Sequence, residues 1–538
     1  MKNIKSLFIA GAVLALSGTA MTSCDLDLAP IDYYGSGSYW KTEAQVDGYI
    51  DGLHSSFRSY VFNHTIIYGE MRGGMYKNGN VSADGQTIYY GDIRNQNFDA
   101  DHTGVSSFGG YYGALANVNL FISRVTDADY VDEAKKKYYL GIAYGLRAFY
   151  YFDLYRLYGG VPLRLDVKVI DGEIDPNKLY LPRSTAKQTM DQIKSDIATS
   201  LEYFGSTTNF DPYGKGVKAY WSKAATECLA GEVYLWNAKV TTGDNTANTA
   251  DLATAKQHLE NVMNNYGLKM MDNFSDVFDA QNHKGNSEEI MVARYMEGEA
   301  TNSNVDLWTY SLATGSTRSR YREDGTPWND PFNLAASGGA QWLEYNPNLF
   351  LGYDKADSRR DATFMASYTK DNAGNLQFAG SHVRKNIGYV NAQGARVSCG
   401  DYIIYRLPWV YLSLAEIANM EGDNASVKKY IDMVRKRAYG TNWDEAKYGF
   451  TAGDFTTNEL GILHEKDKEF VQEGQRWWDL RRMTLTKGGK HLVFCKEGSL
   501  DGSAPVLDES QAYKVLWPLD KGLLNNDPQL EQTPGYTK

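Results

Sequence analysis

The chain has 538 residues, of which 55 are lysine or arginine and 66 are aspartate or glutamate, so its net charge is −11. Proteins that bind nucleic acid through its phosphates need the opposite balance, which argues against nucleic acid as a partner. The chain also holds 40 tyrosines and 11 tryptophans. Their rings stack and also hydrogen-bond, so the surplus favours contact with carbohydrate or protein, although most of these rings are expected in the core.

The first residues predict a secretory signal peptide over 1–23, because Lys2 and Lys5 precede a short apolar run that ends in small residues. Cys24 follows directly, as in a bacterial lipoprotein, so we expect Cys24 to be lipidated and to anchor the mature chain in a membrane. An ordinary cleaved signal followed by a chance cysteine is the alternative. Residues 24–39 are polar and without period, which is typical of a tether.

The spacing of apolar residues after the tether predicts a mostly α-helical fold. The segment 140–158 is apolar or aromatic on nearly every face, so its helix must be packed on several sides. Gly159, Gly160 and Pro162 end this helix, because glycine supplies a left-handed cap and proline prevents continuation. The predicted helices are 40–62, 111–125, 130–158, 184–204, 219–238, 251–266, 409–420, 426–438 and 459–483, with Ser184 as an N-cap and a short strand at 289–293.

Successive predicted helices carry alanine and glycine at positions where two helices would be in close contact. They carry tyrosine or tryptophan at positions where large side chains would pack between helices. Such pairs resemble tetratricopeptide units, which stack into a right-handed superhelix whose neighbours bury each other's faces. We therefore divide the mature chain into the lipidated tether, 24–39, an N-terminal helical region, 40–290, and a C-terminal region, 291–538, with binding loops and further helices.

Two long stretches, 68–110 and 295–353, lack helical spacing, and loops of this length in a compact domain are usually functional. Aromatic faces can stack on the C–H side of a sugar ring, while arginine, asparagine and aspartate hydrogen-bond its hydroxyls. Tyr76, Trp308 and Trp328 lie off the helical stripes, which favours their exposure. Local packing of such a tryptophan is the alternative.

Motifs for catalysis are weak. The sequence has no zinc-hydrolase, nucleophile-elbow, Walker or dinucleotide pattern, so we expect no metal and no cofactor. The most enzyme-like feature is Glu465, Glu469 and Glu473 on one face of the predicted helix 459–483. A glycosidase pair needs carboxyl groups roughly 5 to 9 Å apart across a cleft, whereas these would point the same way. We therefore favour an ion-pair network with the arginines that follow: Arg476, Arg481 and Arg482.

Several distinctive blocks are spread over the whole mature chain: Cys24 with the residues that follow to Pro30, LRAFYYFDLYRLYGGVP at 146–162, YRLPWVYLSLAE at 405–416, EFVQEGQRWWDLRR at 469–482 and DPQLEQTPGY at 527–536. Together these blocks resemble the SusD/RagB family. The resemblance implies a mostly helical fold with four tetratricopeptide-like pairs and a loop-rich face that holds ligand.

The same resemblance implies a lipid-anchored protein of the bacterial outer membrane, exposed at the cell surface and without catalytic activity. Such proteins cap a SusC-like, TonB-dependent transporter and deliver glycan fragments to it. Peptide capture by a RagB-like import subunit is one alternative, and a surface glycosidase is a weaker one. The expected ligand-binding residues are Arg72, Tyr76 and Asn78 near the family's first aromatic position, Trp308 near the second, Trp328 near the third, and Tyr310.

Overall fold

The computed structural model describes residues 39–78, 91–103, 108–167, 179–302, 320–328, 333 and 343–537. The predicted signal peptide and Cys24 lie outside these residues, and so do Trp308 and Tyr310. Within the described ranges the chain is mostly helical, as predicted, and its strands are short. No helix in this part of the chain is long and apolar enough to cross a lipid bilayer.

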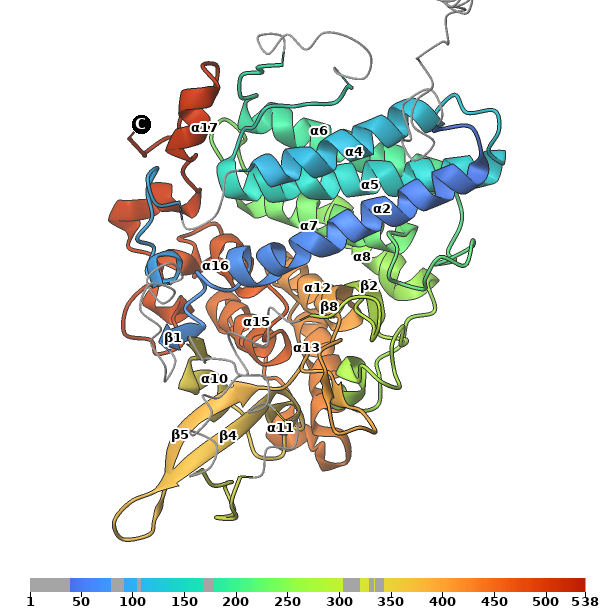
Figure 1. Cartoon of the computed structure of the whole chain (residues 1–538). Helices are drawn as coiled ribbons and strands as arrows, with labels where there is room; N and C mark the ends of the chain where they lie inside the picture. The colour runs from blue at the N-terminus through green and yellow to red at the C-terminus, as the bar shows by residue number, and fades with distance from the viewer. Residues whose placement is uncertain are drawn as a thin grey trace, which may run out of the picture.

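Long helices of the first half lie side by side in the upper part of Figure 1. They are α2 (Glu43–Phe62), extended by the π-helical segment η1 (Asn63–Tyr68), α4 (Gly109–Val125), α5 (Glu133–Tyr158), α6 (Ala186–Phe204), α7 (Lys223–Lys239) and α8 (Asp251–Asn265). Each helix from α4 to α8 packs on the next one in the chain. These contacts confirm the predicted stack of neighbouring helices.

Shorter helices make up the second half, and most of them lie below the first half in Figure 1. They are α10 (Pro347–Leu351), α11 (Arg359–Thr363), α12 (Leu407–Glu421), α13 (Asn424–Tyr439), α14 (Glu445–Tyr448), α15 (Phe455–Glu469), α16 (Arg476–Arg482) and α17 (Lys521–Asn526). Helix α17 is the exception and lies at the upper left, near α6 in this view. Because α12 packs on both α8 and α13, the stack continues from one half of the chain into the other.

The predicted central helix is α5, and it is buried from Tyr138 to Tyr158 except for one tyrosine. Its small residues permit close approach of neighbouring elements: a Cβ atom at Gly145 would lie 2.2 Å from the indole nitrogen of Trp221. Gly159 ends the helix at a φ of 76°, a conformation that glycine adopts without strain. The N-cap of helix α6 lies one residue later than predicted, because Thr185 rather than Ser184 accepts the N-cap hydrogen bond.

Strands pair in twos and each described pair is antiparallel. The pairs are β1 (Tyr76–Asn78) with β3 (Leu343–Tyr345), β2 (Glu289–Ala293) with β8 (Tyr402–Arg406), β4 (Phe364–Lys370) with β5 (Leu376–Val383), and β6 (Tyr389–Val390) with β7 (Arg396–Val397). The bounds of β2 agree with the predicted strand at 289–293. The β4–β5 hairpin projects at the lower end of the molecule (Figure 1).

The prediction of one long helix over 459–483 is wrong. Helix α15 ends at Glu469, Gln472 and Gly474 adopt positive φ values of 66° and 75°, and α16 starts after this turn. The turn lies against the segment that follows α2, where a Cβ atom at Gly474 would lie 2.7 Å from the Cα atom of Thr65. The backbone N–H of Trp477 then donates to the Gly69 carbonyl at 2.8 Å. A contact with residues far away in the sequence therefore interrupts a pattern that is helical on both sides.

The carboxylates of Glu465, Glu469 and Glu473 are buried in an ion-pair network, as predicted. Their cations differ from the expected ones and come from four other segments: Arg359, Lys385, Arg406, Arg435 and Arg437. Burial by itself would raise the pKa of Glu469, but the surrounding guanidinium groups overcome it and hold that pKa well below its usual range.

The three expected arginines bind elsewhere. Arg476 pairs with Asp467, Arg482 binds Glu416 with Nε to Oε1 at 2.9 Å, and Arg481 donates to the Arg156 carbonyl at 2.7 Å. The ion pairs of the three glutamates and the contacts of these three arginines all lie inside the protein and join helices to one another. Their arrangement suits a structural role and offers no open cleft between two carboxyl groups.

Candidate functional site

The two irregular stretches meet in the structure, although about 270 residues separate them. Strand β1 belongs to the first stretch and pairs with β3, which belongs to the second. In this ladder Tyr76 lies opposite Tyr345, Lys77 opposite Glu344, and Asn78 opposite Leu343. Strand β3 in turn contacts β5. We call this assembly the β1–β3 platform and define it by Lys77, Glu344, Ser381, His382 and Trp328, of which Lys77 is the exposed member and the other four are buried.

A buried carboxyl group holds the underside of the platform together. Glu70 accepts hydrogen bonds from the hydroxyls of Tyr76 and Tyr345, at 2.9 and 2.8 Å, and from the backbone N–H of Gly474 at 3.2 Å. The two tyrosine rings lie 4.4 Å apart between their centroids. Burial raises the pKa of Glu70 to about 7, and the hydrogen bonds from Tyr345 and Gly474 only partly offset this effect.

Tyr76 therefore supports the platform from below. Its side chain is 5% exposed, and it lies in a strand rather than in the open loop that the sequence predicted. Successive residues of a strand point to opposite faces, so Lys77 faces the other way and is 43% exposed. Asn78, the last residue of β1, stays a predicted ligand-binding residue.

Arg72 is the second predicted binding residue that the structure buries. Its guanidinium lies 4.0 Å from the ring centroid of Trp477 and 4.7 Å from that of Phe98, and its Nε donates to Gln96 at 2.7 Å. Burial lowers the pKa of Arg72. The side chain is fully enclosed, so it ties the first irregular stretch to the C-terminal part of the chain and is not brought to the platform surface.

An ion pair occupies the upper side of the platform. The Lys77 ammonium lies 3.3 Å from Oε2 of Glu344, whose other carboxylate oxygen accepts from the backbone N–H of Ser381 at 3.2 Å. Gly380 makes room for this carboxylate, because a Cβ atom there would lie 2.3 Å from Oε1. Burial raises the pKa of Glu344, and Lys77 works against the rise. Lys77 thus presents a positively charged donor on a fixed base.

Trp328 lies beside His382 and is 8% exposed, so the expectation of an open ring is wrong and the packing alternative describes its position. The centroid of its ring is 6.0 Å from that of His382, and its backbone N–H donates to the Arg320 carbonyl at 2.9 Å. Burial, together with the positive charge of Arg320, lowers the pKa of His382 to about 3, so this imidazole is neutral. Only a small part of Trp328 is therefore open to a ligand.

Sequence reasoning missed Lys77, Glu344 and His382. Strand alternation next to Tyr76 could have identified Lys77 as the outward residue. The other two come from separate segments, and no local pattern links them to residue 77.

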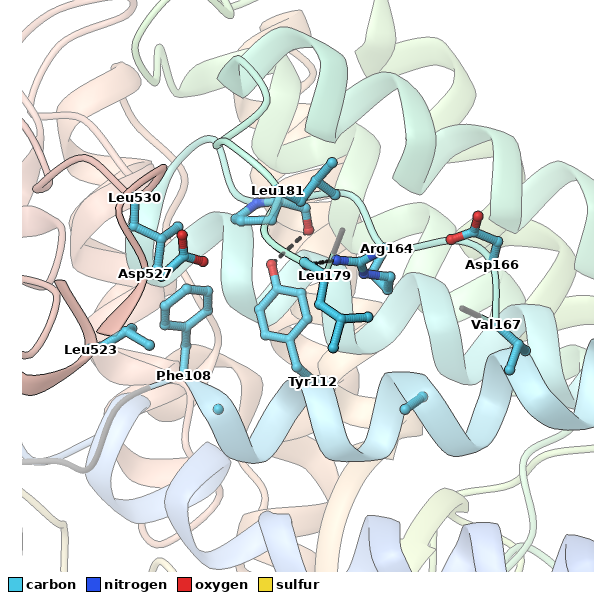
Figure 2. Close-up of a pocket in the computed structure, with 13 residues that line it drawn as sticks. Phe108, Tyr112, Arg164, Asp166, Val167, Leu179, Leu181, Leu523, Asp527 and Leu530 are labelled. Carbon is cyan, nitrogen blue, oxygen red and sulfur yellow. Dashed lines mark hydrogen bonds between the residues drawn. The ribbon is translucent and has the colours of Figure 1, made fainter. Parts of the chain in front are cut away.

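Figure 2 shows a pocket of about 400 Å³ elsewhere, lined by many apolar side chains, between α4, the residues after α5 and the C-terminal segment. Tyr112 and Arg164 line it, but the tyrosine hydroxyl already donates to the Pro162 carbonyl at 2.6 Å and the guanidinium to the Leu179 carbonyl. Among the described residues, no group of three or more histidine, cysteine, aspartate or glutamate side chains could hold a metal ion.

Comparisons with known proteins agree with this architecture. Residues 41–235 match a family model described as starch-binding and associating with the outer membrane, and residues 234–536 match the model of the SusD family. A SusD superfamily protein from Bacteroides fragilis is 61% identical, covers 93% of this chain and all of its own, and superposes with a TM-score of 0.87. NanU of B. fragilis is 31% identical, covers 95% of this chain and all of its own, and superposes with a TM-score of 0.81.

Among curated proteins, SusD-like protein P38 of Formosa agariphila is 24% identical over 571 aligned positions that cover both chains completely. The family resemblance and the helical fold expected from the sequence blocks are therefore confirmed. The chain belongs to the SusD family.

Proposed function

We propose that the chain is a non-catalytic, lipid-anchored glycan-binding protein of the outer-membrane surface that delivers oligosaccharides to a SusC-like, TonB-dependent transporter. Family membership supports glycan binding, since the model that matches residues 41–235 describes starch-binding proteins of the outer membrane. The observation that carries the proposal is the β1–β3 pairing, which joins both irregular stretches in one platform.

The platform offers what a saccharide needs. Sugar hydroxyls both donate and accept hydrogen bonds, and Lys77 presents a half-exposed donor that Glu344 holds in place. Trp328, which is 8% exposed and packs beside His382, adds a small apolar contact. Trp308 and Tyr310 remain proposed stacking rings, and they fall outside the described residues. Such a site can bind and release a saccharide without cleaving any covalent bond.

Calorimetry with the full mature chain tests glycan binding. The panel contains neutral hexasaccharides with different linkages (maltohexaose, laminarihexaose and xylohexaose) and hexapeptides of mixed sequence. We expect at least one saccharide to bind and Lys77→Ala to weaken its affinity by about tenfold, because a hydrogen bond from a charged donor is lost. Lys187→Ala is the matched control, since Lys187 is 59% exposed on α6 and forms an ion pair there.

Binding of peptides alone would replace the proposal with the peptide-import alternative. Shortened saccharides after incubation with the protein would refute the non-catalytic assignment.

Two further experiments test the anchor and the partner. Mass spectrometry of the wild type should show acyl chains on Cys24, and Cys24→Ala should release the protein from the membrane fraction. Affinity purification of the anchored protein from its own cells should recover an outer-membrane transporter. Recovery of the protein alone, from membranes solubilised without denaturation, would contradict a stable transporter complex.

A further inference from the structure

A second cleft, of about 490 Å³, lies on another part of the surface, between α2, residues 211–220 and the residues that follow β2. We call it the α2 cleft and define it by Asp51, Arg58, Lys215, Tyr220 and Glu299. Asp51 and Arg58 are seven residues apart on α2, which places them on the same side of the helix, two turns from each other. Strand β2 contacts α2 directly, and both contribute residues to the lining of the cleft.

Acidic and basic groups alternate around the cleft. The Asp51 carboxylate accepts from the Lys215 ammonium at 3.0 Å and from the Tyr220 hydroxyl at 2.9 Å. Two turns further along α2, the Arg58 guanidinium donates to Glu299 at 2.8 Å. The Asp51 and Glu299 side chains are 48% and 58% exposed, so both carboxylates can also reach a ligand. Arg294 is the third cation that lines the cleft, and its guanidinium lies 3.2 Å from Asp401 and 3.3 Å from Glu289. Each of the three cations therefore already has an acid partner.

The walls of the cleft are already ordered. The backbone N–H groups of Lys215 and Gly216 donate to the Asp211 carboxylate at 2.7 and 2.8 Å, which fixes this loop. The Tyr220 ring packs on the imidazole of His54 with the centroids 4.1 Å apart. Burial lowers the pKa of His54 to about 4, so the imidazole is neutral and accepts from the Trp221 N–H at 2.9 Å. A ligand would therefore meet a surface that needs little rearrangement.

Apolar side chains flank the same cleft. Val217 and Met296 are 48% and 47% exposed, and they are two of the five large hydrophobic side chains that are exposed in the described part of the chain. Tyr220 adds an aromatic ring with a polar end. The cleft therefore combines paired hydrogen-bonding groups with apolar surface at its edge, the combination that suits a ligand with hydroxyls and C–H faces.

We propose that the α2 cleft is a second saccharide-binding site, which holds an uncharged segment of oligosaccharide independently of the β1–β3 platform. Hydroxyl groups complement alternating donors and acceptors in either order, whereas an anionic ligand would need unpaired cations. The inference rests on the proposed function, because it assumes that the protein binds glycans.

Hydrogen–deuterium exchange locates the bound saccharide. The probe is the hexasaccharide of the panel that binds the wild type most tightly, at a saturating concentration. We expect slower exchange in peptides that cover 211–220 and 293–300 as well as in those that cover β1 and β3. In Lys77→Ala the protection at 211–220 should persist, because the cleft does not depend on the platform.

The cleft variant is Asp51→Ala with Glu299→Ala, which removes two half-exposed carboxylates. We expect it to lose protection at 211–220 and to weaken calorimetric binding at the second site by about tenfold or more. Glu133→Ala with Asp191→Ala is the matched control, because these acids are 63% and 58% exposed and form ion pairs far from both sites in the sequence.

The outcomes separate the two proposals. Saccharide binding with protection only around β1 and β3, unchanged in the cleft variant, would overturn the second site and leave the proposed function intact. Absence of binding by every saccharide would overturn both. Protection of 211–220 by a hexapeptide and by no saccharide would show that the cleft serves a different ligand class.

Discussion

Replacing Glu70 with glutamine tests whether a buried carboxyl group controls the stability of the platform. Glu70 is fully buried and accepts from Tyr76, Tyr345 and the Gly474 backbone. Glutamine keeps the shape and one acceptor oxygen but cannot ionise. The difference in unfolding free energy between wild type and Glu70→Gln should therefore change with pH by the amount that the ionisation of Glu70 contributes.

The size of this change follows from the shift in pKa. The Glu70 carboxyl has a reference pKa of 4.5 and a pKa of about 7 in the folded protein. Between these values the folded state binds more protons than the unfolded state, so stability is greatest below the lower value and is lost as the pH rises towards the higher one. One pKa unit corresponds to about 1.4 kcal/mol, so the loss between pH 5 and pH 8 is on the order of 2 to 3 kcal/mol.

Urea unfolding at pH 5 and pH 8, followed by tryptophan fluorescence, measures the effect. We expect Glu70→Gln to gain about 2 to 3 kcal/mol relative to wild type on going from the lower to the higher pH. Tyr76→Phe serves as control, because it removes a hydrogen bond and leaves the carboxyl group ionisable. A difference between wild type and Glu70→Gln that stays constant over this range would refute the reasoning.

Three further substitutions test other parts of the structure. Trp328→Ala should destabilise the protein by about 3 to 5 kcal/mol, measured by urea unfolding, because the ring is 8% exposed; glycan binding is then compared in Trp328→Phe. Gly380→Ala should cost about 1 to 3 kcal/mol in the same assay, because its φ is 149° and Glu344 occupies the space. Glu469→Gln should lower stability by about 3 to 5 kcal/mol, because it leaves Arg406 and Arg437 partly unpaired; an unchanged unfolding midpoint would contradict a structural role.

Helices with a strong local pattern were predictable from the sequence. The segment 111–125 became α4 with a start two residues earlier, and 289–293 became β2 with the same bounds. Apolar spacing and terminal glycine or proline act within a few residues, so they can be read without knowledge of the fold.

Features that depend on distant contacts were not predictable. The break between α15 and α16 is set by Gly474 against Thr65, about 400 residues earlier in the chain, while the apolar spacing continues through it. The irregular stretches were recognised as candidates, but their pairing through β1 and β3 was not, because the two strands have only three residues each. Tyr76 was expected to be exposed, and its burial follows from the non-local hydrogen bond to Tyr345.

The cluster around Arg72 has a consequence for the order of events during biosynthesis. Its guanidinium is enclosed by rings from residue 98 and from residues 477 and 517, so part of the cage is among the last segments to be synthesised. Until Trp477 and Trp517 have been synthesised, the Arg72 guanidinium lacks two of the three aromatic rings that enclose it. The segment around Arg72 can thus reach its folded packing only after translation is nearly complete, even if the helices of the first half have already formed.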